Sequence, residues 1–239
     1  MKKFFLALAA MTAAALCADE IRPVWEFNLN EGDLKAIKNT GTAPAKFTCS
    51  NPQLLTWGEG RTGGKALYFG NKIECKPPVC SLQIERDDKV IDFARPFTVE
   101  CWFKADPKLM DNKQYTILGN VSTDMGPGFR ILYGWGAVRV STGDGKKSDS
   151  MTYPTSKQKV ELGVWHHVAL TYDTKTVTLY LNGIKAAEKV MLLPQTRSRT
   201  FQIGSYQGYA YGFPGAISDV KIYNQALTAS QILAKVKDL

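Results

Sequence analysis

Strict alternation of apolar and polar side chains is the feature of this sequence that most limits its fold. In residues 97–104, Phe, Val, Cys and Phe alternate with Thr, Glu, Trp and Lys, and a similar alternation runs through residues 176–182. A period of two is typical of a β-strand with one face in a core, because successive side chains of a strand point to opposite faces. Asn182-Gly183 follows the second stretch directly. This dipeptide accepts the positive φ angles of a type I′ turn and therefore predicts a hairpin.

Comparable short segments recur along most of the chain, separated by turns that are rich in Gly, Asn and Asp. They predict strands at residues 24–28, 66–69, 81–84, 115–118, 129–133, 137–141, 165–172, 201–204 and 216–223. Gly134-Trp135-Gly136 is expected at a hairpin tip, and residues 34–45 are expected to form a loop. About a dozen short strands favour an all-β fold in which two antiparallel sheets form a jelly-roll sandwich.

One short helix is predicted near the C-terminal end of the sequence. Thr228 and Gln231 have the spacing of a capping box, in which each side chain bonds the backbone N–H of the other residue. Ile232 begins the apolar side of this helix. Two lysines in its last turn suit the negative end of the helix dipole.

The first 18 residues are typical of a secretory signal peptide. Lys2 and Lys3 precede an apolar run over residues 4–16, and Ala18 offers a small residue for cleavage. The run is shorter than the roughly 20 apolar residues that span a bilayer, and no later segment looks like a membrane span. We therefore expect one domain over residues 19–239 of a protein that is secreted, periplasmic or at the cell surface. Lipidation at Cys17 is the alternative, although Leu16 stands where a small residue is expected.

The charge balance says little about the partner. Among 239 residues, 30 Lys and Arg stand against 22 Asp and Glu, for a formal net charge of +8. The basic residues are scattered, and an exported protein does not meet nucleic acid. An acidic polysaccharide is the more sensible anionic partner, and solubility explains the charge equally well. The two His argue against a multi-histidine zinc site.

The cysteines predict a disulfide framework. Once Cys17 leaves with the signal peptide, four remain, an even number in an oxidising compartment. Three pairings are possible. Two prolines in the short loop between Cys75 and Cys80 favour a bond there, which leaves Cys49 to pair with Cys101. Alternatively, Cys101 is a buried thiol on a core-facing strand position.

Four segments in order resemble a known family. Residues 97–104, 165–173, 177–183 and 213–228 together resemble the laminin-G-like, concanavalin A-like jelly-roll domains of secreted bacterial proteins. Residues 24–32 and 63–70 resemble the opening segments of that family, so the resemblance covers nearly the whole chain after the signal peptide. It implies two antiparallel sheets. The fold serves lectins, adhesion modules, carbohydrate-binding modules and glycoside hydrolases, so the function has to be argued from a site.

A catalytic site is not evident in the sequence. Retaining glycosidases need two carboxylates about 5 Å apart. The glucanase branch of the family carries three acids on one strand, in a Glu-x-Asp-x-Glu or Glu-x-Asp-x-x-Glu pattern. The nearest stretch, residues 85–89, lacks the third acid and is predicted to be a solvated turn. His167 is interpreted as a structural residue that bonds the backbone, and His166 as an exposed one. We expect no enzyme activity, with a divergent glycoside hydrolase as the minor alternative.

Aromatic residues favour carbohydrate binding instead. Tyr206, Tyr209 and Tyr211 are interleaved with small or polar residues in one loop, where their rings offer apolar faces and hydroxyl groups to a sugar. Trp135 at its hairpin tip is the second candidate. The alternative is that these rings pack over the sheet edge. We predict a lectin-like protein that binds a polysaccharide or cell-surface glycan, with an adhesion or structural protein as the alternative.

The resemblance also implies calcium as the metal to consider. Calcium takes oxygen ligands, which would come from loops. Asn28, Asn30 and Glu31 in the opening turn are candidates, together with Asp219. Ser218 weakens this hypothesis, because it stands where the family commonly has Asp.

Overall fold

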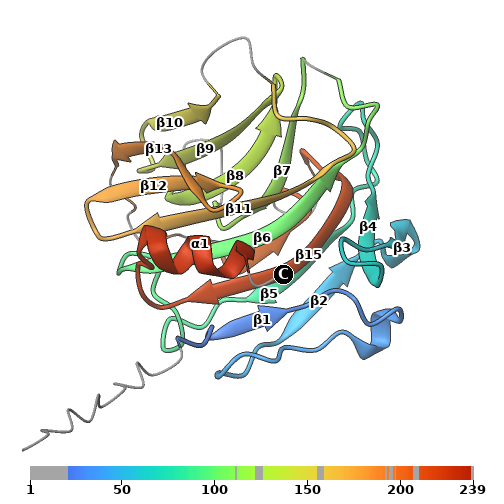
Figure 1. Ribbon diagram of the computed structural model, residues 1–239, viewed down its shortest axis with the longest axis horizontal. Coiled ribbons are helices and arrows are strands. Elements are labelled where there is room, and N and C mark those ends of the chain that lie inside the picture. Colours follow the sequence, from blue (N-terminus) through green and yellow to red (C-terminus); the bar gives the residue numbers. More distant parts are fainter. Residues whose placement is uncertain are drawn as a thin grey trace, which may run out of the picture.

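The computed structural model describes residues 21–110, 112–121, 126–154, 159–191, 193, 196, 198–206 and 210–237. Two antiparallel sheets pack face to face and enclose one core (Figure 1). The predicted all-β sandwich is therefore confirmed. The predicted signal peptide, Cys17 and Tyr209 lie outside the described residues.

The first sheet has eight strands, and β6 and β15 lie at its centre. Its order is β13 (Ile184–Val190), β12 (Thr176–Leu181), β11 (Trp165–Tyr172), β6 (Phe97–Ala105), β15 (Pro214–Tyr223), β4 (Lys65–Gly70) and β3 (Leu55–Glu59), while β1 (Trp25–Phe27) also pairs with β15.

The second sheet has seven strands. Its order is β10 (Ser148–Tyr153), β9 (Ala137–Gly143), β8 (Gly128–Gly134), β7 (Gln114–Gly119), β14 (Thr200–Ile203), β5 (Ser81–Glu85) and β2 (Phe47–Ser50). Two short 3₁₀ turns, η1 (Leu34–Ala36) and η2 (Pro52–Leu54), precede β2 and β3. The first of them lies in the predicted loop over residues 34–45.

Aromatic rings from both sheets fill the centre of the core. Phe97 on β6 stacks on Phe129 of β8, with 5.1 Å between ring centroids. Phe93, in the loop before β6, packs edge-on against Phe97 and stacks on Phe201 of β14. The alternation read from the sequence places each of these strand residues on the inner face, so burial of large apolar rings against one another fixes the register of the sheets.

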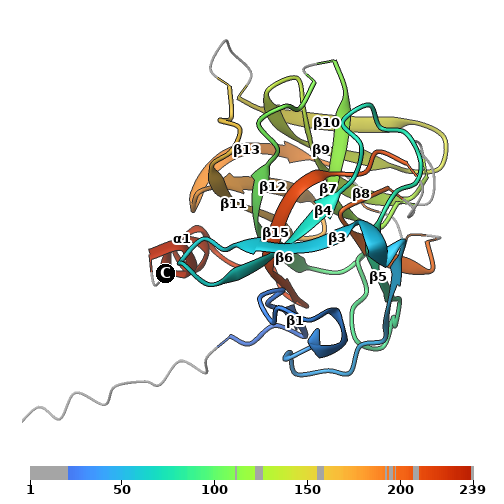
Figure 2. The ribbon, with the colours of Figure 1, turned by 90° about the vertical axis from the view of Figure 1, so that its right-hand side faces the viewer.

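The predicted helix is present as α1 (Ala229–Lys237). The capping box forms: the Thr228 N–H donates to the Gln231 side chain at 2.8 Å, and the Gln231 N–H donates to Thr228 Oγ1 at 3.3 Å. The buried Ile232 joins a second apolar cluster on the outer face of the eight-stranded sheet, and Ile21 packs against the same cluster. Figure 2 shows α1 on the side of the molecule opposite β8 of the other sheet.

The strands that the sequence did not predict all lie at sheet edges. They are β2 and β10 at the two ends of the seven-stranded sheet and β3 at one end of the eight-stranded sheet. On one side of the sandwich the edge strands β10 and β13 are joined by an ion pair between Lys189 and Asp149. The same ammonium donates to the Ser150 carbonyl at 3.4 Å.

Candidate functional site

Trp135 stands at the tip of the β8–β9 hairpin, as predicted. The turn has two residues, Trp135 (φ +53°) and Gly136 (φ +75°), which is the combination of positive φ angles that a type I′ turn requires. The β12–β13 hairpin uses Asn182 (φ +51°) and Gly183 (φ +79°) in the same way. Asn is an ordinary choice for this position, whereas Trp is not. The Trp135 side chain is nevertheless 50% exposed, so burial of the ring does not explain its presence.

Tyr211 is held beside β7 by the backbone. The Thr116 N–H donates to the Tyr211 carbonyl at 2.7 Å, and Tyr211 has a φ of +47°. Paired backbone hydrogen bonds join Tyr206 to Ala210, the residue before Tyr211. Tyr206 is only 6% exposed and packs edge-on against Tyr211, with the Arg130 guanidinium near both rings. Tyr206 therefore supports Tyr211 and is not itself a platform for a ligand.

A cleft of about 410 Å³ brings Trp135 and Tyr211 together, and we call it the Trp135–Tyr211 cleft. Residues from four separate segments line it: Glu74, Cys75, Asn112, Lys113, Gln114, Trp135, Ala210 and Tyr211. The arrangement joins two partly exposed aromatic side chains to a rim of charged and amide groups. That is the combination expected of a site for a small polar ligand with apolar faces.

Unusual backbone conformations gather at this cleft. Eight non-glycine residues of the described chain have positive φ, and three of them, Cys75 (φ +59°), Trp135 and Tyr211, line the cleft. Such conformations cost about 1–3 kcal/mol each and persist where surrounding structure enforces them, often at functional sites. The clustering therefore marks the cleft independently of its aromatic content.

Cys75 links two of the segments that line the cleft. Its thiol donates to the Gln114 carbonyl at 3.3 Å, and burial raises its pKa. The nearby Lys113 lowers the pKa of the thiol and Glu74 raises it, so both charges act on the same wall. Sequence reasoning missed Glu74, Cys75 and Lys113 as site residues, because they come together only in the folded chain.

The comparison with protein families identifies the fold. A family model described as the concanavalin A-like lectin/glucanases superfamily matches residues 81–233. The chain belongs to this superfamily. The comparison with curated proteins gave no match.

Several solved structures share this concanavalin A-like fold. The binding domain of Paraclostridial Mosquitocidal Protein 1 is 16% identical with a TM-score of 0.70, and the alignment covers 91% of this chain and 52% of that one. The botulinum neurotoxin serotype G binding domain is 13% identical with a TM-score of 0.68, covering 90% and 51%. A botulinum neurotoxin DC binding domain, solved with rat synaptotagmin II, is 11% identical with a TM-score of 0.67, covering 90% and 51%. The chain thus spans about half the length of these proteins, and at such identities the likeness shows the fold alone.

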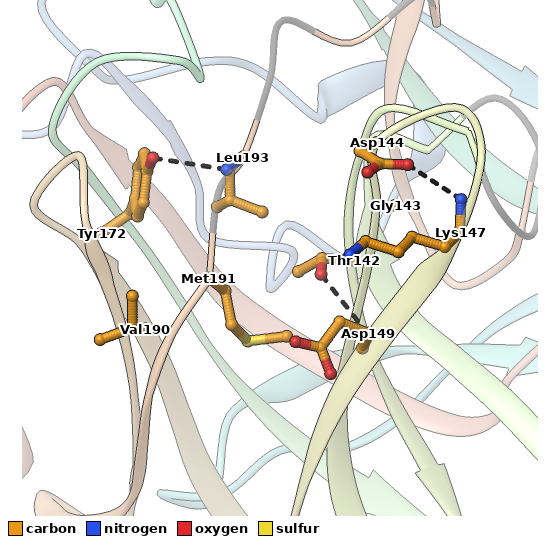
Figure 3. A pocket seen from close by; sticks show the side chains of 9 residues that line it. All are labelled: Thr142, Gly143, Asp144, Lys147, Asp149, Tyr172, Val190, Met191 and Leu193. Atoms are coloured by element: carbon orange, nitrogen blue, oxygen red, sulfur yellow. Dashed lines mark hydrogen bonds between the residues drawn. The ribbon is translucent and has the colours of Figure 1, made fainter.

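The superfamily includes glucanases, which use a pair of carboxylates for hydrolysis. One such pair, Asp144 and Asp149, lines a second pocket. This pocket of about 490 Å³ lies between the β9–β10 turn and the end of β13 (Figure 3). Asp144 accepts the backbone N–H groups of Lys147 and Lys146, which lower its pKa. A hydrogen bond from Lys189 lowers the pKa of Asp149. Glycoside hydrolysis needs one carboxyl group with a raised pKa as proton donor, and neither of these fits that role.

A buried acid also lies beneath α1. Glu100, only 2% exposed, accepts a hydrogen bond from the Tyr223 hydroxyl at 2.8 Å and lies 3.2 Å from His167 Nε2. Burial alone would raise the pKa of Glu100, but the hydrogen bond and charge of His167 outweigh it, and the pKa is lowered. Its burial leaves this carboxylate out of reach of a ligand in solution, so it is not a candidate for a surface site.

Two histidine predictions need correction. His167 bonds the carboxylate of Glu100 through its ring and not the backbone, because both side chains point to the outer face of the sheet under α1. His166 is buried and not exposed, since its Nε2 lies 2.9 Å from the Glu161 carbonyl and its Nδ1 contacts Asn182.

The predicted disulfides are absent from the described chain, where Cys49, Cys75, Cys80 and Cys101 are all free thiols. Cys75 points toward Gln114 on β7 and not toward Cys80. Cys49 lies on an edge strand of one sheet and Cys101 on a central strand of the other, so the second pairing also fails. The alternative of a buried Cys101 thiol is correct, and burial raises the pKa of Cys80 to about 12.

The calcium candidates are only partly brought together. The Asp219 N–H donates to the Asn28 carbonyl at 3.0 Å, which places these two side by side. The carboxylates accept local hydrogen bonds, Glu31 from the Asn30 N–H and Asp219 from the Ser218 hydroxyl. Within the described ranges, no three acidic, His or Cys side chains gather where they would hold a metal ion. Because two of the four candidates are asparagines, which that grouping does not include, calcium binding by these residues stays a prediction.

Proposed function

We propose that this protein binds carbohydrate, without a catalytic step, through the Trp135–Tyr211 cleft. The observation that carries the proposal is an exposed indole at a turn position that Asn fills in the sister hairpin. A sugar presents C–H faces and hydroxyl edges, so it is suited by an aromatic face bordered by amide and charged groups. The cleft provides both, with Asn112 and Gln114 as the amides.

The fold supports a binding role in general terms. The structures described above are toxin binding domains, and the family description names lectins beside glucanases. Export to the periplasm, the cell surface or the medium, expected from residues 1–18, is part of the proposal, because free polysaccharide is found outside the cytoplasm. Among the described residues, no helix is long and apolar enough to span a membrane.

The adhesion or structural alternative requires a broad apolar surface. Ile184 and Val190 are 69% and 63% exposed, but they stand at opposite ends of the edge strand β13. Lys185, Glu188 and Lys189 lie between them, and charges on an edge strand oppose edge-to-edge association. These two side chains therefore do not form a broad apolar surface, and we prefer the lectin hypothesis to the adhesion hypothesis.

A glycan array tests the proposal on the purified protein, with and without calcium. We expect binding that Trp135→Ala and Tyr211→Ala each weaken by about tenfold or more, equivalent to about 1.4 kcal/mol or more. Val190→Ala removes a comparably exposed apolar side chain that does not line the cleft and is the matched control. Silence of the wild-type protein on the array would overturn the carbohydrate hypothesis. Binding that survives both aromatic substitutions would overturn the site.

A further inference from the structure

The charge around Trp135 is mostly positive. Arg139 on β9 places its guanidinium carbon 5.8 Å from the centroid of the indole ring. Lys113 lines the same cleft. The Lys159 side chain packs beside Gly136, the second residue of the Trp135 turn. Glu74 is the acidic residue among those that line the cleft.

Two of these cations, Arg139 and Lys113, have no acidic partner among the described residues. Within the part of the chain that the structure describes, neither Arg139 nor Lys113 forms an ion pair with a carboxylate. Cations elsewhere on the sheets do: Lys189 pairs with Asp149, and Lys221 lies 3.4 Å from Glu26. Within the described ranges, the charges of Arg139 and Lys113 are therefore not neutralised by an ion pair.

Arg139 is also held in position. Its Nη2 donates to the Ser150 hydroxyl of the neighbouring strand at 2.6 Å, and the ring of Trp135 borders it on another side. Its buried Nε has no hydrogen-bond partner among the described residues. A guanidinium restrained in this way loses little side-chain freedom when it binds an anion, and its planar fork matches a carboxylate or sulfate group.

We propose that the cleft selects an acidic sugar, one that carries a uronate carboxylate or a sulfate ester. The ring of this sugar stacks on Trp135, and its anionic group lies toward Arg139 and Lys113. This inference rests on the proposed function and narrows it from carbohydrate to anionic carbohydrate. A uronate carboxylate and a sulfate ester both place negatively charged oxygen atoms on a sugar ring, so both fit these cations. The test must therefore distinguish a uronate from a sulfated sugar.

Isothermal titration with matched oligosaccharides provides the test. Carrageenan and agarose oligosaccharides compare a sulfated with a neutral galactan, and mannuronate and mannose oligomers compare a uronate with a neutral hexose. We expect at least one acidic probe to bind about tenfold more tightly than its neutral counterpart, a preference of about 1.4 kcal/mol. The preference should shrink as salt is added, because the selecting charges are near the surface.

Charge-removing variants locate the preference. Arg139→Gln and Lys113→Gln should each reduce affinity for the acidic probe several-fold more than affinity for the neutral probe. Arg139→Lys keeps the charge but lacks the fork, and should recover only part of the loss. Lys38→Gln is the matched control, since this exposed lysine precedes β2 at the opposite edge of the seven-stranded sheet from β10. Should Arg139→Gln unfold the protein, the change at Lys113 still decides the result.

The outcomes separate the two proposals. Equal affinity for acidic and neutral probes, with both lost in Trp135→Ala, would overturn the acidic preference and leave the proposed function standing. An acidic preference that Lys38→Gln reduces as much as Arg139→Gln would also overturn it, because net charge alone would then be the cause. Failure of every probe to bind would overturn the acidic preference, and silence on the glycan array as well would overturn the proposed function itself.

Discussion

Trp135 and Asn182 occupy the same position in two hairpin turns of the same kind. Each is the first residue of a two-residue turn, each has a φ close to +50°, and each is followed by a glycine with positive φ. Asn tolerates the left-handed conformation through local hydrogen bonding, whereas for a bulky side chain it costs roughly 1–2 kcal/mol. The fold would accept Asn at both positions, so the indole at one of them points to a role in binding.

Trp135→Asn should therefore separate stability from binding. We expect the free energy of unfolding to rise by about 1 kcal/mol, because the strained residue is replaced by a favoured one. Binding of the glycan found on the array should be lost. Urea denaturation and titration of the same preparation measure the two effects. The reciprocal change Asn182→Trp should destabilise the protein without affecting binding, and a stabilising effect there would contradict the interpretation.

The cysteines offer a chemical reporter of the cleft. In the native protein, a thiol-reactive reagent should label the half-buried Cys75 and Cys49, and should reach Cys80 and Cys101 only on unfolding, since both are buried with raised pKa values. A bound glycan should protect Cys75, which lines the cleft, and leave Cys49 reactive. Peptide mass spectrometry after timed alkylation measures this. Equal protection of both thiols would indicate a global effect and not occupation of the cleft.

The buried Glu100 should make stability depend on pH in acid. Its folded pKa lies below its usual value of 4.5, so its contribution is fully present above about pH 4.5 and is lost as pH falls through the folded pKa. Denaturation at a series of pH values should show this loss in the wild-type protein and a flatter profile in Glu100→Gln. At neutral pH the substitution should cost about 1–3 kcal/mol, because it disturbs a buried hydrogen-bonded group.

Glu188→Gln is the exposed counterpart of that substitution. Its ion pair with Lys185 is 3.3 Å long, and both side chains are about half exposed. We expect less than about 1 kcal/mol of change, as for surface pairs in general. A pH profile that flattens equally in both variants would show that Glu100 is not the residue responsible.

Two glycines with positive φ should respond very differently to alanine. A Cβ on Gly204 would lie 2.4 Å from the Phe69 ring in the core, whereas Gly63 in the β3–β4 turn has nothing within 4 Å. Gly63→Ala should cost about 1 kcal/mol from backbone strain alone. Gly204→Ala adds overpacking and should cost roughly 3 kcal/mol or more. Chemical denaturation compares the two, and similar losses would mean that Phe69 yields more easily than the packing indicates.

The sequence predicted the strands whose inner faces are deeply buried, since alternation is clearest where one face meets a core. It did not predict β2, β3 or β10, because an edge strand buries less of its inner face and its apolar period is weak. The Gly-flanked tip at Trp135 was readable, since turn chemistry is local. The opposing wall with Cys75 and Lys113 was not, because its residues are brought together only by the pairing of distant strands.

The second apolar cluster indicates on which face of the protein a solid support or a fusion partner would lie. Ile21, near the start of the described chain, and Ile232, near its end, pack on the outer face of the eight-stranded sheet. The residues that border Trp135 and Tyr211 belong to the outer side of the other sheet. A bead, a sensor chip or a reporter attached near Ile21 or Ile232 would therefore lie on the side of the eight-stranded sheet. The cleft would then face the solution and stay accessible to a long polymer.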